Sequence, residues 1–329
     1  MIRIPRLRLI ADDTHIRFMR LRLVCFIISG VLVALSAVSV IYPGLNYGID
    51  FKGGILMEVR MPEPADLGGM RTLLGDQGLG EVALQSFGAD TDVLIRVERQ
   101  PGDETEQLAA VETVKGVLEQ EYGVDISYRR AEFVGPKVSE ELLQDGILAI
   151  GLALGLVLIY IWLRFEWQYG VGAIVALVHD VLLTIGMFAV TGLEVNLSTV
   201  AAVLTIVGYS LNDTVVIFDR VRENLRRYKA MPVEELLDRS VNDTLARTLM
   251  TSLTTLLALL ALFFFGGEVI RGFTFAMIWG VLVGTYSTIY IACPILLSFN
   301  LRSAGAKPAK DDTPAEDETG DEEGQPAKS

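Results

Sequence analysis

Hydrophobic and polar positions divide the chain into six long apolar runs, separated by polar segments of very unequal length. Each run reaches the roughly 17–20 residues that an α-helix needs to cross about 30 Å of hydrocarbon. The pattern therefore predicts a polytopic α-helical membrane protein. Its six predicted spans are residues 21–42, 143–163, 170–190, 197–218, 248–265 and 273–298.

Basic residues gather beside some of these spans and avoid others. Six arginines lie between residues 3 and 22, and five basic residues lie between residues 220 and 229. Because short cytoplasmic flanks carry an excess of Lys and Arg, both termini are predicted to be cytoplasmic. Residues 1–20 are then a basic cytoplasmic N-terminus, residues 43–142 lie outside, and residues 219–247 form a cytoplasmic link.

A cleaved signal peptide is the alternative interpretation of the first apolar run, because it also begins with basic residues. The run Leu23–Tyr42 is longer than the roughly 7–15 apolar residues of an ordinary signal peptide. Its removal would also leave an odd number of spans. Both observations favour a first span that is retained.

The polar segment 43–142 has secondary-structure patterns of its own. Strands are predicted at residues 54–61, 82–87, 93–98 and 125–133, and helices at 65–77 and 104–122. The second helix has a predicted apolar face of Leu108, Val111, Val114 and Leu118. The order β-α-β-β-α-β is that of a ferredoxin-like sandwich, so we expect one external α+β domain here.

The net charge of −13 comes mainly from two polar regions. Residues 43–142 hold 19 acidic and 9 basic side chains, and residues 301–329, predicted to be a disordered cytoplasmic tail, hold 8 and 4. No basic patch supports a nucleic-acid partner. Cys25 and Cys293 lie inside apolar runs, and no Cys/His cluster has metal-ligand spacing. We therefore expect no metal, no cofactor and no enzymatic activity.

Polar side chains within the spans are the candidate functional residues, because hydrocarbon disfavours them. Asp213 follows Leu197 by sixteen residues, roughly 24 Å along a helix. It lies either inside the fourth span or in water just beyond a misplaced boundary. Arg247 opens the fifth span as a partner of Asp213 or as a snorkelling anchor. His179 and Asp180, near the middle of the third span, form a proton-accessible cluster or a packed pair.

Small residues recur every four positions in the sixth span, which predicts close helix packing rather than chemistry. They are Gly272, Ala276, Gly280 and Gly284, and Gly151 and Gly155 repeat the spacing in the second span. Within the cytoplasmic link, residues 231–246 have Pro232 at a helix start and apolar residues on one side. We expect an amphipathic helix on the membrane surface that orients Arg247.

Several motifs resemble those of the SecD/SecF protein-export family. The first follows the first span and contains Gly48, Asp50, Phe51, Gly53 and Gly54. Residues 207–224, VGYSLNDTVVIFDRVREN, and segments 247–252 and 284–288 resemble the family's fourth, fifth and sixth spans. The His179–Asp180 pair also matches. The resemblance covers roughly residues 17–301 and is to the SecF type, because the SecD type has Asp-Leu in place of Asp50–Phe51.

This resemblance implies a subunit of the accessory protein-export complex of the bacterial inner membrane. It implies pairing with SecD in a twelve-span body of the RND-transporter type. That body would assist the SecYEG channel and use the proton-motive force to move a preprotein outward, with other accessory Sec membrane subunits as further partners. By matching motifs, Asp213 and Arg247 would belong to the proton path.

Two other functions are compatible with a six-span layout. Half of an RND-type small-molecule exporter would need a larger external domain than about a hundred residues. A passive membrane anchor would gain nothing from Asp213, Arg247, His179 and Asp180 at membrane depth, where each is costly. The small external domain and the polar residues therefore favour proton-coupled protein export over the exporter and the anchor, respectively.

Overall fold

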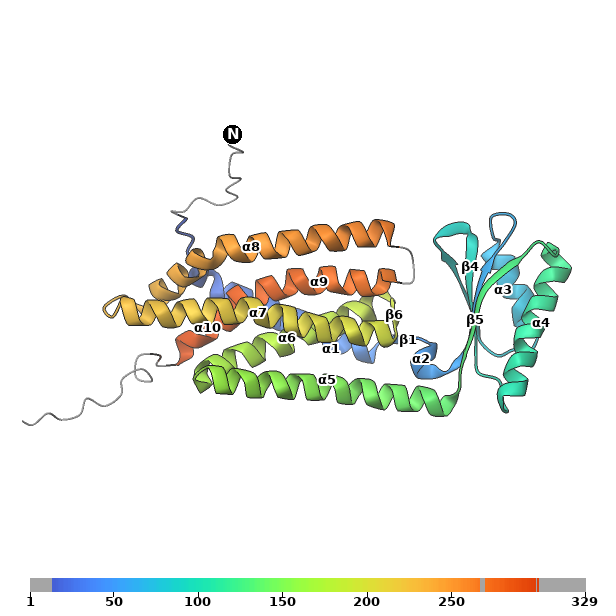
Figure 1. The fold of residues 1–329 in the computed structure, drawn as a ribbon, viewed down its shortest axis with the longest axis horizontal. Coiled ribbons are helices and arrows are strands. Elements are labelled where there is room, and N and C mark those ends of the chain that lie inside the picture. Colours follow the sequence, from blue (N-terminus) through green and yellow to red (C-terminus); the bar gives the residue numbers. More distant parts are fainter. Residues whose placement is uncertain (1–13, 267–269, 300, 302–329) are drawn as a thin grey trace, which may run out of the picture.

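The computed structural model describes residues 14–266, 270–299 and 301. In this part of the chain, six long helices run side by side and a small sheet domain lies at one end of them (Figure 1). All six are long and apolar enough to span a membrane, so the predicted fold class is confirmed. The helices are α1 (Arg22–Ile41), α5 (Pro136–Arg164), α6 (Trp167–Thr191), α7 (Leu197–Arg227), α8 (Val233–Phe265) and α9 (Arg271–Ser287).

Short helical segments extend two of these spans. A 3₁₀ turn, η1 (Phe18–Leu21), leads into α1. After α9 the sixth span continues through a π-helical segment, η3 (Thr288–Ala292), and then α10 (Cys293–Ile295) and η4 (Leu296–Ser298). The described chain begins and ends at the end of the bundle away from the sheet domain (Figure 1).

Two helices continue far beyond their apolar runs. Helix α7 extends to Arg227 and α8 already begins at Val233. The separate surface helix predicted for residues 231–246 is therefore not formed, because most of that segment is the first part of α8. The apolar side of this region lies inside the protein rather than on lipid, with Leu236, Leu237 and Val241 no more than 1% exposed. Packing of one face against protein allows a helix to continue outside the hydrocarbon.

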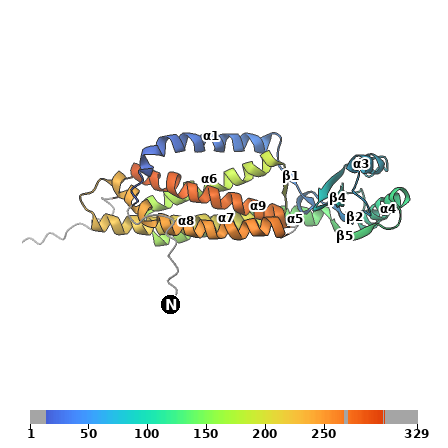
Figure 2. The same cartoon turned by 90° about the horizontal axis from the view of Figure 1, so that it is seen from above.

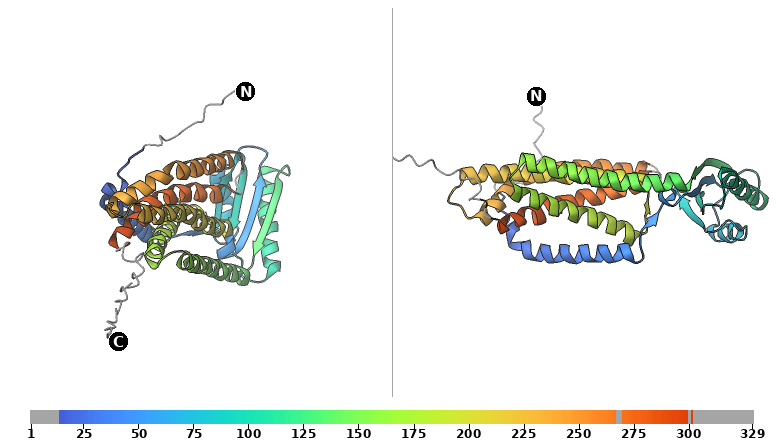
Figure 3. Two further views of the ribbon diagram at one scale, coloured as in Figure 1. Left: turned by 60° about the vertical axis from the view of Figure 1, so that its left-hand side comes forward. Right: turned by 90° about the horizontal axis from the view of Figure 1, so that it is seen from below.

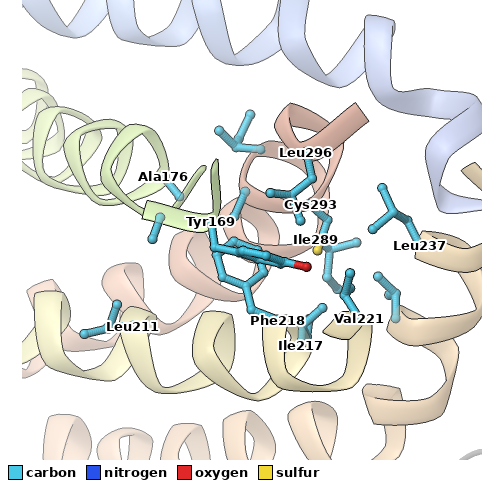
Figure 4. Packing of buried hydrophobic residues seen from close by; sticks show 14 of the residues in the cluster. Tyr169, Ala176, Leu211, Ile217, Phe218, Val221, Leu237, Ile289, Cys293 and Leu296 are labelled. Carbon is cyan, nitrogen blue, oxygen red and sulfur yellow. The ribbon is translucent and has the colours of Figure 1, made fainter. Parts of the chain in front are cut away.

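The interior of the bundle comes mainly from α6, α7 and the sixth span, whereas α1, α5 and α8 are largely exposed. Aromatic and aliphatic side chains from these inner elements meet around Tyr169 and Phe218, whose rings lie 5.2 Å apart (Figure 4). Helix α1 packs along α6 at one side of the bundle (Figure 2). The exposed faces of the outer helices are the ones available to lipid or to other proteins.

The small residues of α9 differ in how closely other helices approach them. A side chain at Gly280 would overlap Ile206 of α7, and one at Gly284 would press against Ser210. Ala276 is fully buried. Gly272, in contrast, has no neighbouring atom where a Cβ would lie, and the same holds for the two small positions of α5 at residues 151 and 155. Close approach of α7 and α9 therefore depends on the second half of the α9 repeat.

The sheet domain has the predicted β-α-β-β-α-β order. Its elements are β2 (Gly54–Arg60), α3 (Leu67–Gly75), β3 (Val82–Phe87), β4 (Ala89–Val97), α4 (Glu104–Tyr122) and β5 (Ser127–Val134). The strands form one antiparallel sheet in the order β3-β4-β2-β5, with Met57 opposite Ile95 and Ala131. Helices α3 and α4 cover the face away from the bundle (Figures 1 and 3). The opposite face of the sheet is turned toward the helix ends.

The buried face of α4 differs from the prediction by one position. Leu108 is 58% exposed, whereas Gln107 is 1% exposed and begins the buried face that Val114 and Leu118 continue. Gln107 is tolerated there because its amide is paired: Nε2 donates to the Gln100 carbonyl at 2.7 Å, and Oε1 accepts from the Gln100 amide at 3.0 Å. A satisfied polar side chain can thus replace an apolar one at the edge of a core.

Three short elements connect the sheet domain to the helices. They are β1 (Asn46–Tyr47), α2 (Ile49–Lys52) and β6 (Glu194–Val195), and the two strands pair in parallel. Strand β6 lies in the loop between α6 and α7, almost 150 residues from β1 in the sequence. Neither strand is visible in the hydrophobic pattern, because two residues are too few to show an alternation.

Candidate functional site

Asp180 is the centre of a buried polar cluster that joins three helices. Its Oδ2 atom accepts hydrogen bonds from Ser210 Oγ of α7 at 2.6 Å and from Ser287 Oγ of α9 at 2.8 Å. Its Oδ1 atom lies 2.9 Å from Nδ1 of His179. Asp180 is only 1% exposed, so these contacts stabilise a carboxyl group that would otherwise be buried without partners.

The cluster continues toward α1 through aromatic residues. The His179 ring lies 6.1 Å from the ring of Tyr286, whose hydroxyl contacts Ser29 Oγ at 2.9 Å and donates to the Cys25 carbonyl at 3.1 Å. The Nε2 atom of His179 is buried and has no hydrogen-bond partner among the described residues. Polar atoms therefore extend across the bundle from α6 to α1.

Asp213 lies one helical turn after Ser210, on the same side of α7. It is 3% exposed, so the interpretation as a water-exposed residue beyond the span does not hold within this chain. Its Oδ2 atom is buried without a hydrogen-bond partner in the described part of the chain, as are Tyr209 OH and Thr248 Oγ1. Buried polar atoms without partners are rare in folded proteins and often mark water, ion or proton sites.

Arg247 is close enough to Asp213 to interact with it electrostatically. No hydrogen bond or ion pair joins the two side chains within the described residues, and Arg247 lies on the exposed side of α8. The structure thus brings His179 and Asp180 into direct contact and places Asp213 one turn along α7 from Ser210, which binds Asp180. It leaves Arg247 at the surface of the chain.

Polar residues also line the outer faces of α7 and α8. Thr205 and Asn212 are exposed on α7, and Arg247 and Thr254 are exposed on α8. Asn212 and Arg247 in particular would be costly against lipid tails. These exposed polar positions are therefore better suited to contact with another protein than to hydrocarbon.

The motif that follows the first span lies at the start of α7, sixteen residues before Asp213. The Gly48 amide donates to the Val195 carbonyl at 2.9 Å, and Asp50 Oδ2 accepts from the Leu197 amide at 2.9 Å. Gly53 and Gly54 have φ values of 74° and 125°, which favour glycine. Phe51 packs edge-on against Tyr47, with ring centroids 6.3 Å apart.

Sequence reasoning missed the partners of these groups rather than the groups themselves. Ser210 and Ser287 stand in polar stretches of their spans, but no sequence pattern indicates that both bind Asp180. Among the described residues, no three His, Cys, Asp or Glu side chains lie close enough to hold a metal ion. The site is therefore built from carboxyl, imidazole, guanidinium and hydroxyl groups.

A helix bundle that keeps carboxyl groups buried between its spans is typical of membrane proteins that move ions, protons or other substrates. The comparison with protein families shows which family of membrane proteins this chain belongs to. Residues 113–302 match the family described as "Protein export membrane protein SecD/SecF, C-terminal", and residues 43–61 match the "SecD/SecF GG Motif". The chain belongs to the SecD/SecF family of multi-pass protein-export membrane proteins.

Curated relatives of the SecF type match nearly the whole chain. "Protein translocase subunit SecF" of Rickettsia bellii is 45% identical over 296 residues, which cover 89% of this chain and 96% of the relative. The protein of that name in Cereibacter sphaeroides is 44% identical over 311 residues, with coverages of 92% and 95%. The chain is therefore a SecF-type translocase subunit, which is a component of a transport system.

Two solved structures of SecDF share the fold. One is a crystal structure of SecDF from Thermus thermophilus, described as a translocon-associated membrane protein; it has a TM-score of 0.79 at 37% identity. The other is SecDF in a "Super-membrane-facing form", with a TM-score of 0.65 at 37% identity. They cover 88% and 89% of this chain, but the chain spans only 39% and 40% of their lengths.

Proposed function

We propose that the chain pairs with SecD and couples the proton-motive force to movement of a preprotein through the SecYEG channel. The observation that carries this proposal is Asp213, a buried carboxyl group in a spanning helix with one oxygen free of hydrogen bonds. Such a group can gain or lose a proton with little rearrangement of its neighbours. Asp180 and His179 of α6, joined to α7 through Ser210 one turn before Asp213, are the proposed continuation of the proton path.

Protonation of Asp213 would remove a negative charge that interacts with Arg247. The attraction between α7 and α8 would then weaken, which could favour a second arrangement of the helices. One proton that crosses about 150 mV releases roughly 3.5 kcal/mol. That energy corresponds to a shift of about 300-fold in a two-state equilibrium, enough to drive a conformational cycle.

Pairing with SecD is supported by the exposed polar face of α7 and α8. Asn212 and Arg247 lie on this face, where a second helix bundle would shield them from lipid. The SecDF chains that resemble this one are more than twice as long, which leaves room for a second bundle of similar size. We infer that SecD covers this face and completes a twelve-span body.

We further propose that both termini are cytoplasmic and that the sheet domain is periplasmic, at the bacterial inner membrane. The arginine distribution supports this orientation. Single cysteines at Gln120 of α4 and at Lys229, between α7 and α8, should react with an impermeant reagent from opposite sides, in a protein whose Cys25 and Cys293 are replaced by alanine. Labelling of both from one side would contradict the topology.

The proton role is tested by Asp213→Asn, which keeps the size and polarity of the side chain but removes its charge. In inverted vesicles with the complete export complex, the variant should assemble normally but lose the stimulation of preprotein translocation by a proton gradient. Asp145→Asn, at an exposed acid in α5, is the matched control and should retain it. Undiminished stimulation in Asp213→Asn would show that this residue is structural.

A further inference from the structure

The candidate proton residues lie inside the helix bundle, so a change of their charge must be transmitted to the sheet domain through the structure between them. The sheet domain is joined covalently to α1, through residues 42–54, and to α5, through Gly135. The candidate proton residues lie on other helices, namely α6, α7 and α8. A movement of these helices can therefore be transmitted to the sheet domain in two ways: through direct contacts with that domain, or through α1 and α5.

Direct contacts with α7 exist at what we call the junction, which consists of Gly48, Asp50, Arg96, Glu194 and Leu197. Strand β1 pairs with β6, which immediately precedes α7. Beside this pair, the Gly48 amide donates to the carbonyl of Val195. The segment that leads into the sheet domain is thus hydrogen-bonded to the chain that leads into α7.

Asp50 extends this attachment to the helix itself. Its carboxylate accepts a hydrogen bond from the amide of Leu197, the first residue of α7. The first amides of a helix have no partner within the helix, and a negative charge there is favoured by the helix dipole. Asn196 caps the same helix at Thr199, so Asp50 supplies an additional cap from a distant segment.

Arg96 and Glu194 form a second link, from the sheet to the same loop. Arg96 lies in β4 and forms an ion pair with Glu194 of β6. The two side chains are only 19% and 20% exposed, and the Nε atom of Arg96 is buried with no partner among the described residues. Loss of either charge would leave the other poorly solvated, which makes such a pair costly to break.

The glycine at position 48 is explained by this ion pair. A Cβ at Gly48 would overlap the carboxylate of Glu194, so a larger residue would push Glu194 away from Arg96. Gly54, at the start of β2, has a related role, because a Cβ there would overlap the carbonyl oxygen of Val97 in β4. Both glycines permit close approach of the segments that the junction connects.

We propose that the junction makes the sheet domain and α7 move as one body, and that this mechanical coupling is the role of the Gly48–Gly54 motif. Asp50, Arg96 and Glu194 are positioning residues in this view, because they act through the segments that they hold together. The functional part of the inference rests on the proposed proton-driven cycle. The rigidity of the junction does not depend on that cycle, and it can be measured in the isolated protein.

The rigidity test uses spin labels on two exposed residues, Gln120 of α4 and Ala201 of α7, in a protein that lacks its two native cysteines. Pulsed electron resonance should give a narrow distance distribution in the parent protein and a broader one after Arg96→Gln or Glu194→Gln. The double variant should be no broader than the single ones, because both act through one pair. Arg99→Gln, at an exposed arginine just after β4, is the matched control and should leave the distribution narrow.

The coupling test measures gradient-stimulated translocation with the same variants and with Asp50→Ala. Each junction variant should lose stimulation while it retains translocation without a gradient, and Arg99→Gln should retain both. Unchanged distance distributions would overturn the inference whatever the proton role of Asp213 is. Broader distributions with full stimulation would overturn the coupling role. If Asp213→Asn alone retains stimulation, the proton proposal fails instead, and the distance data still report on the junction.

Discussion

The buried face of α4 leads to a sharp prediction about the sheet domain. All members of its apolar cluster lie between Ile55 and Ile126, so a fragment of residues 54–134 contains the complete core. We expect this fragment to fold without the bundle. Leu118 is fully buried in its core and Leu108, on the same helix, is 58% exposed. The same substitution at the two positions should therefore have very different effects.

The expected magnitudes follow from burial. Replacement of a buried leucine by alanine costs about 2–5 kcal/mol. A domain of this size has a total stability of about 4–12 kcal/mol, so Leu118→Ala removes a large part of it. For a domain of 60–100 residues, this loss corresponds to a fall in Tm of about 10–30 °C. Leu108→Ala should change the stability by less than about 0.5 kcal/mol.

Thermal unfolding of the two variants and the parent fragment, followed by circular dichroism, provides the assay. The parent should unfold cooperatively, Leu118→Ala should melt much earlier, and Leu108→Ala should melt within about 4 °C of the parent. Equal destabilisation by the two substitutions would refute the assignment of the buried face. A fragment without a cooperative transition would refute its independence from the bundle.

Three further predictions concern charge and packing. The hydrogen bond from Arg60, aided by the charge of Arg129, lowers the pKa of Asp92. The ionised carboxylate therefore stabilises the sheet domain above about pH 4, and this stabilisation should be lost as the pH falls further. Asp92→Asn should accordingly make the Tm of the sheet domain less dependent on pH in this range. Gly280→Leu should lower the melting temperature in detergent, because overpacking costs about 1–3 kcal/mol, whereas Gly272→Leu should not. Arg247→Lys should retain only part of the gradient-stimulated translocation, because an ammonium group lacks the planar fork of a guanidinium.

The elements of the fold that depend on local patterns could be predicted from the sequence. Long apolar runs predict six spanning helices because hydrocarbon tolerates little else, and alternation within residues 43–142 predicts the order of the sheet domain. The candidate carboxyl groups also stand out, since Asp180 and Asp213 interrupt apolar runs. Motifs around residues 48–54 and 207–224 indicate the family, which the comparisons confirm.

The kind of element that each segment forms, and the side chains that do not suit the membrane, can therefore be predicted from local patterns. The partners of those side chains cannot, because they depend on how the segments pack. Gln107 replaces Leu108 in the core because the backbone of Gln100, just before α4, satisfies its amide. Asp180 is stabilised by hydroxyl groups from the distant helices α7 and α9. Asp50 binds the start of α7 across 147 positions of sequence. A hydrophobic pattern records whether a residue is buried, but a hydrogen bond or ion pair depends on which distant segment lies opposite, and that is decided when the helices and the sheet pack together.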